Sequence, residues 1–124
     1  MKTNFNSVAS LILCSVFLIA TACGGKYSES DMLGTWKVND WKVESSGKSI
    51  NSQMDMTFET DGKYNIDFGS KKEAGKYWLS GEYLHTVAEG KSEMSVRIMK
   101  LTSDSLELQM NRGGQLERVI LLHQ

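Results

Sequence analysis

Hydrophobic and polar residues alternate along most of the chain from Leu33 onward, with a period of two rather than the 3.6 of an amphipathic helix. Clusters of Gly, Asp, Asn and Ser interrupt this alternation about every ten residues, which is the spacing of short strands joined by tight turns. The pattern predicts eight strands, over residues 35–44, 50–60, 64–68, 75–79, 83–88, 93–101, 106–110 and 116–123.

The first of these strands changes phase along its length. Trp36 and Val38 fall on one parity, whereas Trp41 and Val43 fall on the other. A change of phase within one strand predicts a β-bulge or a sharp bend near residues 39–40.

The strongest turn signal in the chain is the segment Thr60–Lys63, which contains Asp61-Gly62. An Asp-Gly pair tolerates the positive φ angles of a tight hairpin, so Gly62 is expected at positive φ.

An open meander of eight strands would leave two unpaired edges, and closure removes both. We therefore predict an all-β fold over residues 33–124, an eight-stranded antiparallel up-and-down barrel in which the first strand pairs with the last.

The alternation also assigns a set of inward-facing residues. A barrel of eight strands is just wide enough either to be filled by side chains or to hold one small ligand, so this set is a candidate ligand site and equally a candidate packed core. Its four methionines are adaptable and suit either role. The set comprises Met54, Met56, Phe58, Tyr64, Ile66, Phe68, Met94, Val96, Ile98, Leu106, Leu108 and Met110.

The strands over residues 77–79 and 83–85 carry aromatic residues whose phase the sequence leaves open. In one phase Trp78, Tyr83 and His85 lie together on the outside, where an exposed aromatic cluster marks a contact surface. In the other phase Trp78 belongs to the core. We favour the first phase, in which Tyr77, Leu79 and Leu84 face inward.

Residues 1–22 have the pattern of a secretory signal peptide. Lys2 gives a positive start, and the apolar run over residues 8–20 is shorter than the roughly 20 residues of a membrane-spanning helix. The following segment Ala22-Cys23-Gly24 resembles the bacterial lipobox, although Ala20 stands where Leu is usual. The resemblance implies cleavage before Cys23 and lipidation of its thiol. The alternative is ordinary secretion with cleavage near Ala22 and a free Cys23.

The predicted organisation is a lipoprotein signal peptide over 1–22, a small polar tether over 23–32 and a barrel domain over 33–124. It places the protein in the cell envelope, anchored through lipidated Cys23 to a bacterial membrane, with the outer membrane favoured.

Three segments carry a family resemblance. Residues 33–38, Leu-Gly-Thr-Trp-Lys-Val, resemble the G-x-W motif of lipocalins, and residues 57–64 and 80–84 resemble the short lipocalin-like domains of bacterial envelope lipoproteins. The resemblance implies an eight-stranded barrel with one end closed and a small apolar molecule inside. It also implies that Trp36 plugs the closed end beneath a basic side chain from a late strand, a part expected of Arg118 through a cation–π contact.

Composition excludes several other functions. The 14 basic residues meet 15 acidic ones, so the chain lacks the basic surplus on which a nucleic-acid binder depends. His85 and His123 are the two histidines, and no nucleophile elbow, catalytic triad or metal-ligand spacing is present. Lys71-Lys72 is interpreted as a solvated turn. We expect no enzymatic activity, no cofactor and no metal.

Two functions remain. The first is a membrane-anchored carrier or sensor that binds a small apolar ligand in the barrel. The alternative is a protein-interaction or structural envelope module, an inhibitor or an accessory subunit, with a filled barrel and a partner that the sequence does not identify. An interior cavity of several hundred Å³ favours the first function, because ligand sites have that size. A filled interior with an exposed Trp78 favours the second.

Overall fold

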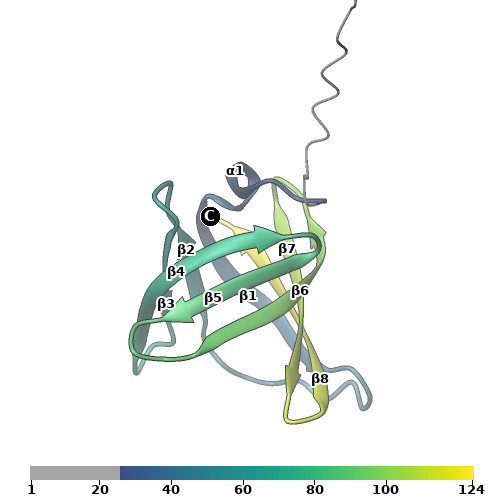
Figure 1. Ribbon diagram of the computed structural model, residues 1–124. Coiled ribbons are helices and arrows are strands. Elements are labelled where there is room, and N and C mark those ends of the chain that lie inside the picture. The colour runs from purple at the N-terminus through teal and green to yellow at the C-terminus, as the bar shows by residue number, and fades with distance from the viewer. Residues whose placement is uncertain (1–25) are drawn as a thin grey trace, which may run out of the picture.

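The computed structural model describes residues 26–124, which form one helical turn and a closed barrel of eight antiparallel strands (Figure 1). Each strand pairs with the next, and the last pairs with the first, so the predicted fold class is confirmed. No helix within the described residues is long and apolar enough to cross a membrane. The elements are α1 (Glu29–Met32), β1 (Gly34–Val43), β2 (Asp55–Phe58), β3 (Lys63–Asp67), β4 (Lys72–Ser80), β5 (Tyr83–Ala88), β6 (Glu93–Leu101), β7 (Ser105–Arg112) and β8 (Gln115–His123).

The barrel has two unlike ends. One end carries α1 and the turns β2–β3, β4–β5 and β6–β7, and α1 covers it, so we call it the closed end (Figure 1). The opposite end, here the open end, carries the long β1–β2 loop and the turns β3–β4, β5–β6 and β7–β8.

The predicted irregularity of the first strand is confirmed. The register between β1 and β8 shifts between Val38 and Asp40, as a bulge requires. The shift brings Trp36 on one side of it and Trp41 on the other into the same buried interior. A second shift, which the alternation did not reveal, lies in β6 between Ile98 and Lys100.

The β2–β3 turn is the tight hairpin that Asp61-Gly62 predicts. Gly62 has a φ of +76°, and its amide donates to the Glu59 carbonyl at 3.3 Å. The carbonyl of Gly62 in turn accepts from the amide of Tyr77 at 2.9 Å, which joins the turn to β4.

Several predicted segments are wrong in extent. The strand predicted over 75–79 begins at Lys72, a residue interpreted above as part of a solvated turn. The strand predicted over 50–60 begins only at Asp55, because the bulged β1 draws the preceding residues into irregular pairing, with the Ile50 amide bonded to Trp41 O and the Val38 amide to Met54 O. The tether predicted over 23–32 is wrong for its described part. Residues 29–32 form α1, whose Met32 is buried, and Tyr27 packs against the core. Residues 1–25, including Cys23, lie outside the described residues.

We expect Gly62→Val to destabilise the protein by about 1 kcal/mol or more, because a β-branched side chain is strained at this positive φ. Urea unfolding of the purified barrel measures the change. Gly62→Asn is the matched control, since Asn adopts the left-handed region at a lower cost, and it should lose clearly less stability. Equal stability of the Val and Asn variants would contradict the turn.

Candidate binding site

The closed end is sealed around Trp36. This side chain is fully buried, and its indole Nε1–H donates to the carbonyl of Met32 at 2.8 Å. The ring of His123 meets the indole edge to face, with ring centroids 4.7 Å apart. His123 Nε2 lies 3.1 Å from Leu33 O, and because a carbonyl only accepts, Nε2 carries the proton. Trp36 therefore fills the interior of the closed end.

The predicted pairing of Arg118 with Trp36 is wrong. Arg118 lies on the outward parity of β8, next to the buried Val119, and its guanidinium binds Glu44 at 2.7 Å and Glu107 at 3.0 Å. These hydrogen bonds raise the pKa of Arg118, with the bond to Glu107 as the largest cause. The late-strand side chain that covers Trp36 is His123 instead.

A buried carboxylate closes one side of the open end. Glu117 is only 2% exposed, on the inward parity of β8. Its Oε1 accepts from the Trp41 indole at 2.9 Å and from Arg112 at 3.3 Å, and its Oε2 accepts from Gln115 at 2.9 Å. The Arg112 guanidinium also lies 5.9 Å from the centroid of the Trp41 ring. Burial by itself raises the pKa of Glu117, but the hydrogen bonds from Gln115 and Trp41 and the charge of Arg112 outweigh it and hold the pKa below its ordinary value.

The predicted inward set divides into three groups. Met94 is 63% exposed, so its placement inside the barrel is wrong; it faces the inward parity but lies beyond the barrel wall at the open end. Phe68, Val96 and Met110 are half-buried against the core. The buried members belong to a single cluster with Trp36, Trp41 and Leu121; they are Met54, Met56, Phe58, Tyr64, Ile66, Ile98, Leu106 and Leu108.

The same buried cluster includes Tyr77 and Leu84, so the barrel centre is occupied by side chains. Tyr64 reaches toward the open end, where its hydroxyl donates to Glu73 Oε2 at 3.0 Å. Burial, and then the bond to this carboxylate, raise the pKa of Tyr64 to about 12. Tyr64 is therefore a neutral donor at physiological pH.

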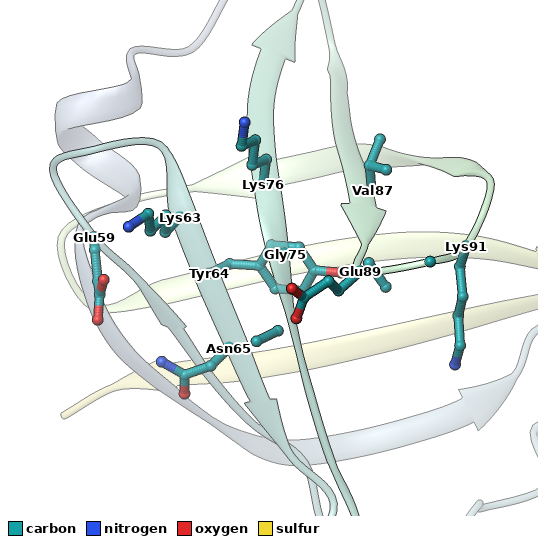
Figure 2. A pocket seen from close by; sticks show the side chains of 12 residues that line it. Glu59, Lys63, Tyr64, Asn65, Gly75, Lys76, Val87, Glu89 and Lys91 are labelled. Carbon is teal, nitrogen blue, oxygen red and sulfur yellow. The ribbon is translucent and has the colours of Figure 1, made fainter.

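A groove of about 620 Å³ crosses the outer face of β3, β4 and β5 (Figure 2). It is larger than the four other pockets found alongside it in the described residues. The outward-facing Ala74 of β4 and Val87 of β5 are small and lie along it, and Gly75 and Ala88, on the inward parity, also line it. A Cβ at Gly75 would lie 2.0 Å from the Val87 carbonyl oxygen, so the two strand backbones approach too closely there for any side chain.

Charged side chains of both signs surround this groove, as Figure 2 shows. The basic ones are Lys63, Lys76 and Lys91, and the acidic ones are Glu59 and Glu89. Lys63 and Lys91 also form exposed ion pairs, which contribute little to stability and leave both amines free to turn toward a ligand. The groove thus combines small, mostly apolar residues with a charged rim. This rim can accommodate positively or negatively charged groups of a ligand.

The aromatic residues of β4 and β5 take the phase that the sequence favoured. Tyr77 and Leu84 are buried, whereas Trp78 and Tyr83 are among the exposed large hydrophobic residues. The Trp78 and His85 rings stack with centroids 5.3 Å apart and planes 9° apart. His85 Nδ1 lies 2.8 Å from Ser95 Oγ, which fixes the imidazole in this position.

Sequence reasoning missed the groove residues Ala74, Gly75 and Val87. The only local signal was a pair of small residues within a strand otherwise rich in long side chains. It also missed Glu117, although this residue shares the inward parity of Val119. Within residues 26–124 no three His, Cys, Asp or Glu side chains group as metal ligands would.

The topology and the plugged end define a small lipocalin-like barrel. Residues 32–108 match the family of lipocalin-like domains, and the chain belongs to that family. A lipocalin-like protein from Bacteroides uniformis ATCC 8492 is 17% identical with a TM-score of 0.60, over 76% of this chain and 99% of the other. An uncharacterized protein from Bacteroides eggerthii DSM 20697 is 13% identical with a TM-score of 0.60, over 75% and 99%. At these identities the two structures show the fold alone. No curated protein matches the chain.

We expect Glu117→Leu to destabilise the barrel by about 1–3 kcal/mol, because the buried Trp41 indole N–H loses its acceptor. Glu117→Gln keeps an acceptor for the indole N–H and should lose less stability than Glu117→Leu. Folding lowers the pKa of Glu117 from its ordinary value of 4.5. The charged carboxylate therefore stabilises the protein at pH values above 4.5, and this stabilisation is lost as the pH falls below 4.5 toward the lowered pKa.

Urea unfolding on either side of that pH checks both statements. The Gln variant should lose less stability on acidification than the original chain does. Identical pH profiles for the two proteins would contradict the assigned role of the carboxylate.

Proposed function

We propose that this protein is a lipid-anchored binding protein of the bacterial cell envelope, attached through Cys23, with the outer membrane as its favoured location. Its lipocalin-like barrel takes a small, largely apolar ligand. Membership of the lipocalin-like family and the lipobox-like segment Ala22-Cys23-Gly24 support this proposal. The proposal involves no catalytic step, no cofactor and no nucleic acid.

The groove across β3–β5 is the observation that carries the ligand-binding proposal. Its volume of about 620 Å³ lies within the usual range for small-molecule sites, whereas the predicted interior site is occupied by buried side chains. We therefore place the ligand against Ala74, Gly75 and Val87 rather than in the barrel centre. Affinity there comes from apolar burial, at about 25 cal/mol per Å² before the costs of association, so the site selects by shape and tolerates varied ligands.

The second candidate is a protein-interaction module, and the filled interior favours it. The mixed charges of Lys63, Lys76 and Glu89 around the groove suit the rim of a protein interface, which is polar and exposed. In that case a partner's apolar side chain fills the groove. Saturable binding of a free small molecule would favour ligand binding over the interaction module. A protein–protein interface needs contacts well beyond one pocket, so the groove alone would not hold a free molecule for that purpose.

We expect an apolar fluorescent probe to bind residues 26–124 saturably, and Ala74→Trp to weaken this binding at least tenfold, about 1.4 kcal/mol. Ala74 is exposed on the outer face of β4, so an indole there fills the groove while the strand tolerates it. Titration of the probe and of a fatty acid provides the measurement.

Lys100→Trp is the matched control, since it adds the same indole to an exposed position on β6 outside the groove. It should bind the probe as the original chain does. Absence of saturable binding up to the solubility limit of the probe would rule out the ligand-binding function and leave the interaction module.

We expect Cys23→Ala to release the protein from membranes or to leave an unprocessed precursor, because the thiol that carries the lipid is gone. Membrane fractionation and the mass of the mature chain provide the readout. A matched Cys14→Ala variant should be processed and anchored normally, since Leu13 before it is not small. If Cys23→Ala is cut at the same position and remains with membranes, the anchoring proposal is wrong.

A further inference from the structure

The first described residues lie at one corner of the closed end. Lys26 Nζ lies 3.7 Å from Glu82 Oε1, in the β4–β5 turn, and Tyr27 packs against the core. The Lys26 side chain accordingly reaches this turn, at the end of the barrel that α1 covers.

Two residues separate Lys26 from Cys23, so three Cα–Cα steps of about 3.8 Å join them and their separation is at most about 11 Å. A lipid on Cys23 therefore holds the β4–β5 turn close to the bilayer surface. This step rests on the proposed lipidation.

Exposed aromatic side chains lie next to that turn. Tyr83 is 47% exposed and pairs with Ser80, directly at the turn. Trp78 is 36% exposed and pairs with His85. It is two residues from the turn, or about 7 Å at the rise of a strand. Both side chains are therefore close to the turn that a lipid on Cys23 would hold near the membrane.

The charges at this corner do not form a basic patch. Arg97 and Lys26 both pair with Glu82, and the exposed first turn of α1 carries Glu29 and Asp31. Attraction to anionic lipids is therefore a minor term. Trp and Tyr, by contrast, suit the headgroup layer, because each combines an apolar ring with a polar N–H or O–H group.

We propose that the outer face beside the β4–β5 turn, with Tyr83 and Trp78, lies in the headgroup layer of the membrane that carries the Cys23 lipid. Ala74 of the groove lies four residues from Trp78 along β4, or about 13 Å, toward the open end. The membrane contact thus fixes the orientation of the barrel and leaves the groove accessible from the aqueous side.

Tryptophan fluorescence of the full lipidated chain in phosphatidylcholine vesicles tests this contact. Trp36 and Trp41 are buried in the barrel, so Trp78 is the tryptophan that a lipid reaches. Acyl chains brominated near the headgroup should quench its emission more than chains brominated near the bilayer centre. The quenched emission should be absent from Trp78→Phe.

A tryptophan at the opposite end is the control. Leu116 is exposed at the start of β8, at the open end, and Leu116→Trp in the Trp78→Phe background should remain unquenched. Equal quenching at both positions, or none at Trp78 in chains that stay with the vesicles, overturns the membrane contact alone. Quenching that requires anionic phosphatidylglycerol overturns the aromatic mode of contact. A chain that leaves the vesicles lacks its anchor, which overturns this inference together with the proposed lipidation.

Discussion

The closure of this barrel depends on how tightly the chain packs around Trp36. The indole bonds to the Met32 carbonyl and meets the His123 ring, so one side chain of β1 joins α1 to the end of β8. Gly34 makes this possible, because a Cβ there would lie 2.5 Å from His123 Nε2 and its φ is +110°. The Gly of the G-x-W motif thus provides the space, and the Trp fills the barrel end beneath it.

Dense packing at this end determines what the rest of the barrel can do. Eight strands enclose little more than their own side chains, and the large residues Phe58, Tyr64 and Tyr77 use that space. Tyr77 secures the β2–β3 hairpin as well, through a bond from its hydroxyl to Glu59 O at 3.0 Å. Removing any of these rings to admit a ligand would cost several kcal/mol, since large-to-small core changes typically cost about 2–5 kcal/mol. A hollow outside the barrel, where the short side chain of Ala74 leaves the outer face of β4 open, carries no such cost.

The sequence was sufficient for the parts of this structure that depend on local alternation. The eight strands, the bulge after Val38 and the hairpin at Gly62 all follow from neighbouring residues. The pairing of Arg118 with Trp36 failed because β8 alternates: Val119 and Leu121 face inward, which puts His123 inward and Arg118 outward. The prediction that Met94 lies inside the barrel was wrong for a different reason. The alternation gives the direction in which a side chain points, but not where along the strand the barrel wall ends. The groove depends on Gly75 meeting Val87 across two strands, and no local pattern expresses that contact.

The two ends of the barrel differ in how firmly they are held. At the closed end, α1 and the end of β8 meet on Trp36, through the Met32 carbonyl and the His123 ring. At the open end, Glu117 secures β1 to β8, but Phe68, Val96 and Met110 remain half-buried on the other strands. Half-buried apolar side chains, flexible Met among them, rearrange at low cost. Adaptation to a ligand or partner is therefore expected on the β3–β7 side, which includes the strands that carry the groove.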